Sequence, residues 1–238
     1  ILRGEKPQMP EGNLLMDYLS GAEITYLNQS EWGGHEALAK ELQASYQAQG
    51  RKAFFIPVGA SDEVGLGGYI KASEELQQDF SDIGMEPEYI VTATGSGGTQ
   101  AGLIVGTQML GMRSQVVAFN VSDDAAYFDR KIRDDVTLWK QRYNQHFDQD
   151  AMKIKTVEGY LGAGYGIAGP EIFDIISELG RTEGLFLDPV YTGKAFHGMG
   201  AELLKGESGH LSGAKNVVFI HTCGLFGVFP QQQNFRFE

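Results

Sequence analysis

The segment from Tyr89 to Leu110, YIVTATGSGGTQAGLIVGTQML, constrains the fold more than any other part of the sequence. It opens with a short apolar run rich in β-branched residues, which predicts a strand, and it closes with a helical pattern that starts at Thr99. Three glycines and two small hydroxyl residues lie in between. Glycines gather at such a position when another group must approach the backbone closely. The segment therefore predicts a strand, a glycine loop and a helix in succession.

The rest of the chain alternates in the same way. Short apolar runs predict strands at residues 22–27, 52–58, 89–93, 115–121, 152–157, 185–191 and 216–222. Apolar residues at helical spacing and N-terminal signals predict helices at residues 35–49, 61–80, 99–110, 128–143, 171–180, 193–206 and 224–230. Alternating strands and helices of this kind form a parallel sheet with helices on both faces. We therefore expect an α/β fold with a doubly wound parallel sheet.

The glycine loop predicts an anion site. Ligands of doubly wound sheets bind beyond the carboxyl ends of the strands, which directs attention to the loops at residues 94–99, 188–194 and 222–224. In the first loop, N–H groups at the start of a helix point outward with the positive end of the helix dipole behind them. Glycines let the backbone wrap an anion, and Ser96 and Thr99 can donate hydroxyl hydrogen bonds. A tight strand-to-helix turn capped by threonine is the alternative.

Neither common nucleotide motif fits this loop. The P-loop pattern requires Gly-Lys-Ser/Thr after its second glycine, but Gly98 is followed by Thr99 and Gln100. The dinucleotide fingerprint requires a glycine three places after Gly97, where Gln100 stands. The phosphate compound is therefore expected to be of another kind.

Composition excludes several classes of partner. The 238 residues carry a formal net charge of -12, which argues against binding nucleic acid or an anionic membrane through a basic surface. No apolar run has the length of a membrane span, no secretory leader is visible, and the single cysteine, Cys223, is typical of a reducing compartment. We therefore expect a cytoplasmic protein. The five histidines show no metal-ligand spacing, so no metal is expected. The chain begins at Ile1 rather than a methionine, and we expect it to be part of a longer protein.

Four motifs now carry a resemblance to a known family. The stretch GSGGTQAG looks like the phosphate cradle of pyridoxal-phosphate enzymes of fold type II, the tryptophan-synthase β type. The stretches FIPVGASDEVGLGGY, LDPVYTGKAFHGM and FIHTCGLFGVF resemble the D-cysteine desulfhydrase and aminocyclopropane-carboxylate deaminase family, in the family's order, from near residue 12 to the end. The resemblance implies bound pyridoxal 5'-phosphate, a small amino-acid substrate and a homodimer. It also implies that residues 1–58 are the remnant of a smaller α/β domain and that residues 59–238 form the larger cofactor-binding domain.

The resemblance assigns roles to individual residues. Tyr165 and Tyr191 correspond to family tyrosines that flank cofactor and substrate, so they are the expected catalytic residues. Thr222 would face the pyridine nitrogen of the cofactor. The residues expected to contact the cofactor are Thr94, Gly95, Ser96, Gly97, Gly98, Thr99, Thr192 and Thr222.

Thr192 separates two activities within the family. Deaminases that open the cyclopropane ring carry an acid directly after the tyrosine of DPVY, whereas this chain has Thr192 there. The difference favours β-elimination from a D-amino acid, which yields a keto acid, ammonia and sulfide. Two alternatives stay open: an aminocyclopropane-carboxylate deaminase, and a non-catalytic α/β protein that binds a phosphate ligand or a partner chain through the same loop.

The chain departs from the family at three places. Family members hold the cofactor through the lysine of a Gly-Gly-Asn-Lys stretch, which a Ser-Asn-His stretch follows, and neither occurs here. The family uses the lysine equivalent to Lys194 structurally, so the chain alone is expected to be inactive, with a complete parent acting as a carbon–sulfur lyase. Cys223 replaces a glycine beside the cofactor ring, and Asp62 stands where desulfhydrases commonly have asparagine.

Overall fold

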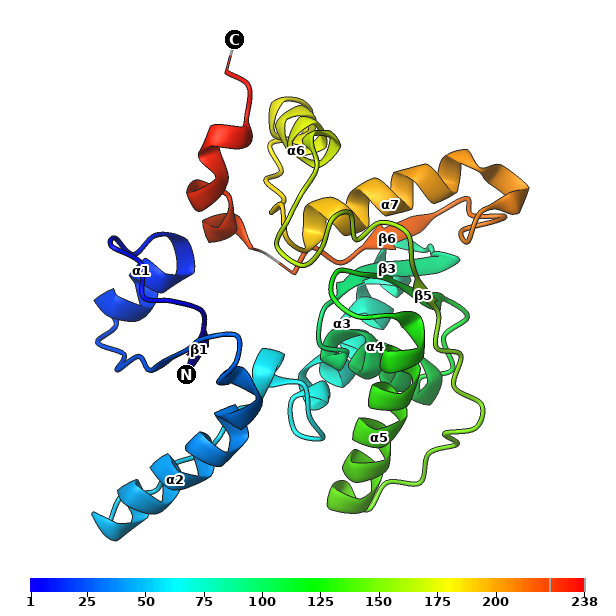
Figure 1. Ribbon diagram of the computed structural model, residues 1–238. Coiled ribbons are helices and arrows are strands. Elements are labelled where there is room, and N and C mark those ends of the chain that lie inside the picture. The colour runs from blue at the N-terminus through cyan, green and yellow to red at the C-terminus, as the bar shows by residue number, and fades with distance from the viewer. Residues whose placement is uncertain (223, 238) are drawn as a thin grey trace. The chain divides into compact units, whose positions relative to one another are not determined.

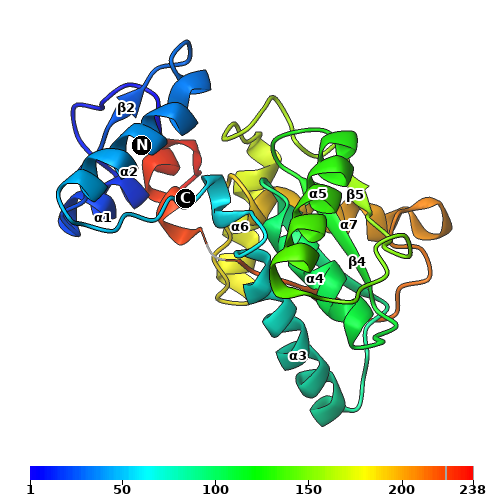
Figure 2. The same cartoon turned by 90° about the horizontal axis from the view of Figure 1, so that it is seen from below.

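The chain divides into two compact units. A computed structural model describes residues 1–222 and 224–237, with one unit at Ile1–Pro57 and the other at Val58–Glu238. The first unit is the blue segment in Figures 1 and 2. The division does not test whether the units are the remnant of a smaller domain and a cofactor domain, so that assignment stays a prediction.

The first unit has little core. A two-residue parallel pair joins β1 (Leu2–Arg3) to β2 (Tyr26–Leu27). Its helices are α1 (Gly12–Leu19), η1 (Trp32–Gly34) and α2 (His35–Ala48). The strand predicted at residues 52–58 is wrong, although the side chains there do alternate in exposure, with Phe54 at 72% and Ile56 at 64%. A run with strand propensity forms no strand when no neighbouring strand offers it hydrogen bonds.

The second unit is built on a parallel sheet of order β5-β4-β3-β6. Its strands are β3 (Tyr89–Thr94), β4 (Gln115–Asn120), β5 (Thr156–Val157) and β6 (Val217–Phe219). Its α-helices are α3 (Leu66–Ile83), α4 (Gly98–Met109), α5 (Ala125–Tyr143), α6 (Pro170–Thr182) and α7 (Thr192–Leu204). Short 3-10 turns are η2 (Val58–Ala60), η3 (Gly206–Ser208), η4 (Leu225–Gly227) and η5 (Phe229–Asn234).

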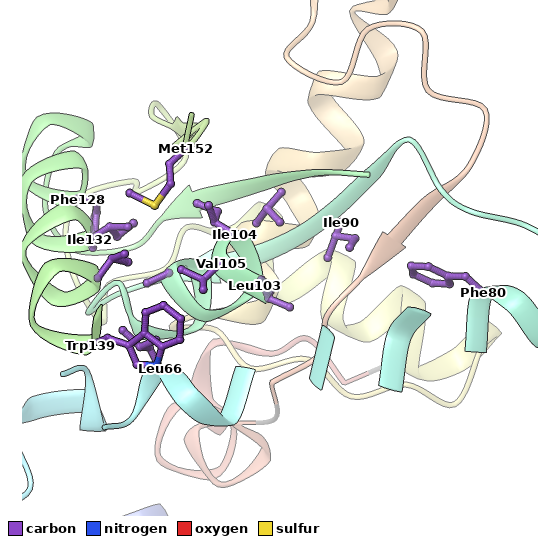
Figure 3. Close-up of a cluster of buried hydrophobic side chains, with 13 residues drawn as sticks. Leu66, Phe80, Ile90, Leu103, Ile104, Val105, Phe128, Ile132, Trp139 and Met152 are labelled. Carbon is purple, nitrogen blue, oxygen red and sulfur yellow. The ribbon is translucent and has the colours of Figure 1, made fainter. Parts of the chain in front are cut away.

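Helices cover both faces of this sheet, which confirms the expected doubly wound α/β class. Ile90 of β3 points into a cluster shared with α3, α4 and α5, shown in Figure 3. Its neighbour Val91 points the other way, into a cluster with Ala195 and Met199 of α7. Successive residues of a strand face opposite sides, so the same six-residue strand supplies both cores.

The α3 and α4 helices pack almost backbone to backbone (Figure 1). Gly98, Gly102 and Gly106 recur every four residues and share one face of α4. A Cβ atom added at Gly102 would lie 2.5 Å from the Leu66 carbonyl oxygen, and one at Gly106 would lie 2.5 Å from the Ser73 Cβ. This close crossing brings the turn that precedes α3 beside the N-terminus of α4.

Three more sequence predictions fail, two of them because carboxylate side chains accept backbone hydrogen bonds. The strand predicted at residues 185–191 does not form, since the Asp188 carboxylate accepts the N–H groups of Val190 and Tyr191, each at 2.8 Å. The helix predicted from residue 61 begins at Leu66, because the Asp62 carboxylate accepts the amide of Gly65 at 2.7 Å in a preceding turn. The terminal helix predicted at residues 224–230 consists of 3-10 turns.

A buried carboxylate fixes the C-terminal end of α7. Glu202, with 1% exposure, accepts hydrogen bonds from the Tyr160 hydroxyl at 2.5 Å, the Lys205 ammonium at 2.6 Å and the His210 amide at 2.7 Å. Burial by itself raises the pKa of this carboxyl. The three donors outweigh burial and lower the pKa of Glu202 to about 2, so the group stays ionised.

Candidate functional site

The glycine loop joins β3 to α4 at the carboxyl edge of the sheet. Gly97 is the N-terminal cap of α4 and has φ of 91°, a left-handed conformation that residues with a side chain rarely adopt. The N–H groups of Ser96, Gly97 and Thr99 donate to no acceptor within residues 1–222 and 224–237. The Gly98 N–H is bonded internally, to the Ser61 Oγ at 3.0 Å. Among the described residues, three amides at a helix N-terminus are therefore left without an acceptor, as is typical of anion sites at helix N-termini.

The surroundings of the loop also fit a phosphate group held close to the backbone. A Cβ atom at Gly95 would lie 3.1 Å from the Tyr191 Cε1 and 3.3 Å from the Val121 Cγ2, so a side chain there would crowd both neighbours. The buried Thr94 hydroxyl has no hydrogen-bond partner in the described part of the chain. Native proteins rarely leave such a group unpaired, so a donor or acceptor from outside the chain is expected there.

Two tyrosines meet beside this loop. The hydroxyl of Tyr165, from the glycine-rich segment after β5, is hydrogen-bonded to the hydroxyl of Tyr191, just before α7. The ring centroids lie 5.9 Å apart with planes at 73°. Tyr165 is 57% exposed. Burial raises the pKa of Tyr191, and the hydrogen bond to Tyr165 raises it further, so Tyr191 is a neutral phenol at physiological pH.

Asp188 arranges the backbone that carries Tyr191. Besides the amides of Val190 and Tyr191, its carboxylate accepts the Thr192 amide at 2.8 Å and the Thr192 hydroxyl at 2.7 Å. Thr192 is completely buried, and its hydroxyl is committed to this bond. The expected contact between Thr192 and a cofactor stays a prediction, and the geometry shows its hydroxyl bonded to Asp188 at the start of α7.

The three loops expected at the carboxyl edge come together. Gly95 of the first loop packs on Tyr191 of the second. A Cβ atom at Gly224 of the third would lie 2.6 Å from the Asp188 Cγ. Thr222, at the same edge, is exposed, so its side chain is accessible to a ligand. Cys223, expected beside the cofactor ring, lies outside the described residues.

Lys194 connects the segment that leads to Tyr165 with the helix that follows Tyr191. This lysine of α7 is 1% exposed, and its ammonium donates to the carbonyl oxygens of Leu161 at 2.7 Å and Gly164 at 2.8 Å. Burial lowers the pKa of Lys194. The ammonium therefore holds the segment directly before Tyr165 against the helix that follows Tyr191, which is a structural role.

Sequence reasoning missed Ser61 and Lys131. Ser61 contacts the glycine loop, and the Lys131 ammonium donates to the Ser61 carbonyl oxygen at 3.0 Å. The available signal was the GAS stretch before α3, whose serine was assigned to the start of the helix. Within the described residues, no group of three or more His, Cys, Asp or Glu side chains could hold a metal ion. In the same residues, no helix has the length and apolar character needed to cross a bilayer.

Comparisons with known proteins agree with this geometry. A sequence profile described as "Pyridoxal-phosphate dependent enzyme" matches residues 6–222. A Thermotoga maritima protein provisionally named 1-aminocyclopropane-1-carboxylate deaminase is 35% identical, over 98% of this chain and 70% of its own length. The Arabidopsis thaliana "Bifunctional D-cysteine desulfhydrase/1-aminocyclopropane-1-carboxylate deaminase, mitochondrial" is 31% identical, over 97% of this chain and 56% of its own length.

A solved structure shares the fold as well as the sequence pattern. The structure titled as that of "the ACC deaminase homologue" superposes with a TM-score of 0.82 at 30% identity, covering 98% of this chain and 67% of that one. The chain thus spans between 56% and 70% of the length of these three relatives.

Proposed function

The chain belongs to the pyridoxal-phosphate-dependent enzymes of fold type II, in the family of aminocyclopropane-carboxylate deaminases and D-cysteine desulfhydrases, and from this premise we propose that the complete protein is a desulfhydrase. It would eliminate the β-substituent of a small D-amino acid such as D-cysteine and release a keto acid, ammonia and sulfide. The observation that carries the proposal is the hydrogen-bonded tyrosine pair, whose Tyr191 packs against the glycine loop.

The glycine loop would hold the cofactor by its phosphate. The open amides of Ser96, Gly97 and Thr99 supply donors, and the α4 dipole favours the negative charge. When bound, pyridoxal phosphate withdraws electrons from the carbon that loses its proton, which is the chemistry a β-elimination requires. The 238 residues do not contain the family's Gly-Gly-Asn-Lys motif, whose lysine anchors the cofactor. Alone, they would therefore bind the cofactor without turnover.

The tyrosine pair would stabilise the leaving group. A phenol whose pKa is raised keeps its proton at neutral pH and can donate a hydrogen bond to a neighbouring atom on which negative charge develops. The sulfur of the leaving group gains such charge as the carbon–sulfur bond breaks. Tyr165 is hydrogen-bonded to Tyr191 and is exposed, so it connects Tyr191 to solvent.

Thr192 supports desulfhydrase over deaminase chemistry. No acid follows Tyr191 in this sequence, and the nearby Asp188 carboxylate already accepts four hydrogen bonds. A saturated carboxylate is poorly placed to act as a free acid or base. The second candidate, opening of the cyclopropane ring, is favoured by the names of the relatives that this chain resembles.

The test is a substrate comparison on the complete protein. We expect sulfide and pyruvate from D-cysteine, with little ammonia from aminocyclopropane carboxylate. Tyr191→Phe should lower kcat for D-cysteine by about 10²-fold or more, the range for a lost hydrogen-bond donor to developing negative charge. Tyr143→Phe, a change of the same kind at an exposed position on α5, should leave kcat unchanged. Efficient ammonia release from the cyclopropane substrate without sulfide from D-cysteine would refute the assignment.

The quaternary state is part of the same proposal. We propose a homodimer, by analogy with the family, and a small amino acid as the substrate. Analytical ultracentrifugation of the complete protein tests the first point, and a monomer at micromolar concentration would contradict it.

A further inference from the structure

A turn before α3 forms a second wall of the glycine loop. The turn comprises residues 58–62, and the loop it meets lies more than thirty residues further along the chain. A Cβ atom at Gly59 would lie 2.2 Å from the Ser96 Oγ, and one at Gly98 would lie 2.5 Å from the Ser61 Oγ. The two segments therefore touch without room for a methyl group on either glycine.

The Ser61 hydroxyl makes the polar contacts across this wall. It is 5% exposed, accepts the Gly98 N–H at 3.0 Å and lies 2.6 Å from the Ser96 Oγ. A hydroxyl carries one proton. Ser61 can donate that proton to the Ser96 hydroxyl oxygen. The other acceptor within reach is the Gly59 carbonyl oxygen, which lies 3.4 Å away, near the limit of a hydrogen bond. The Ser96 proton is then free for an anion on the loop.

The turn is strained and is anchored from a different helix. Ala60 has φ of 50°, a left-handed conformation that is costly for a residue with a Cβ atom. Lys131 of α5 donates to the Ser61 carbonyl oxygen at 3.0 Å and pairs with the buried Asp135 carboxylate one helical turn away. Strain of this kind persists only where surrounding contacts hold it, and it concentrates at functional sites.

We propose that Ser61, held in place by Lys131, is a positioning residue for phosphate-ester binding on the glycine loop. Ser61 orients the Ser96 hydroxyl toward the anion and fixes the first turn of α4, so that three amides and one hydroxyl act together on a phosphate monoester. The inference rests on the proposed function only in taking that ester to be pyridoxal 5'-phosphate.

The experiment compares two ligands that differ only in the phosphate. Pyridoxal 5'-phosphate and pyridoxal are titrated against the complete protein, freed of cofactor, by absorbance and fluorescence. Ser61→Ala should weaken binding of the phosphate ester by about tenfold, the effect of losing one such hydrogen bond, while pyridoxal binding is unchanged. A merely structural role would lower both affinities alike, because it would reduce the folded fraction.

Ser73→Ala is the matched control. Ser73 is also a buried serine, on α3, and its hydroxyl donates to the Tyr69 carbonyl oxygen at 3.0 Å, away from the glycine loop. Its substitution should leave the affinity for both ligands unchanged. If Ser61→Ala does not fold, Lys131→Met combined with Asp135→Asn keeps both serine hydroxyls, frees the Ser61 carbonyl and leaves no buried charge unpaired. It should weaken binding of the phosphate ester selectively by a smaller factor.

Three outcomes overturn the proposal: no binding of the phosphate ester to the wild-type chain, an equal loss for both ligands, or no loss in Ser61→Ala. A selective loss together with absent sulfide release from D-cysteine by the complete protein would refute the proposed function and leave the role of Ser61 standing.

Discussion

The crossing of α3 and α4 predicts that one added methyl group on α4 destabilises the second unit. Gly106 is the position to change, because it lies in the helix interior and faces Ser73. A Cβ atom at Gly106 would meet the Ser73 Cβ at 2.5 Å and the Ile70 carbonyl oxygen at 3.0 Å. Carbon atoms normally approach no closer than about 3.5 Å, so the helices must separate locally by about 1 Å in Gly106→Ala.

Two opposing contributions set the magnitude. Overpacking of a tight interface costs about 1–3 kcal/mol. Alanine is a better helix former than glycine by about 1 kcal/mol in a helix interior, which offsets part of that cost. In Gly200→Ala, in the interior of α7, no heavy atom of the described residues lies within 4 Å of the new Cβ apart from the adjoining helix backbone. This variant therefore has only the second contribution and should be more stable than wild type. The difference between the variants isolates the packing cost, about 1–3 kcal/mol.

Thermal and urea unfolding of the two variants measure this difference. A change of 1 kcal/mol shifts Tm by about 2–4 °C in a domain of this size, so Gly106→Ala should melt several degrees below Gly200→Ala. It should also bind pyridoxal 5'-phosphate more weakly, because α3 carries the turn that supports the glycine loop. Equal or greater stability of Gly106→Ala would show that the helices do not cross as closely as described.

Three further predictions concern the loop, the lysines and pH. Gly97→Val should abolish binding of pyridoxal 5'-phosphate. The added Cβ would lie 3.6 Å from Ile132, an ordinary contact, so the loss would come from the φ of 91° at this position, which valine rarely adopts. Retained affinity in the same titration would contradict this prediction. Borohydride reduction of the 238-residue chain with the cofactor should leave no single lysine modified by mass spectrometry, and stoichiometric labelling of Lys194 would show that this buried amine substitutes for the missing one. The folded-state pKa of Glu202 is depressed from 4.5 to about 2, so the stability that this carboxylate contributes is present above pH 4.5 and is lost as the pH falls toward 2. Glu202→Gln should therefore flatten the dependence of the unfolding free energy on pH in that window. An unchanged dependence would exclude the Glu202 carboxylate as its source.

Local sequence determined the elements around the glycine loop. The β-branched run before Gly95 and the helical pattern after Gly98 predicted β3 and α4 within one or two residues, because strand and helix preferences act over a few neighbouring positions. The alternation of such elements was also sufficient to predict the parallel sheet with helices on both faces. The motifs at residues 55–69, 187–199 and 219–229 were enough to place the chain in its family.

Tertiary structure decided which of these residues act together. The Tyr165–Tyr191 bond joins positions 26 residues apart, the Ser61–Ser96 bond spans 35, and the Lys131–Ser61 bond spans 70. A periodic pattern carries no information about such pairs, because it reports how each segment is buried and not which segment covers it. The same reason explains the failed strand at 52–58. Its apolar run signals strand propensity, but only a neighbouring backbone with free hydrogen-bonding groups turns that propensity into a strand.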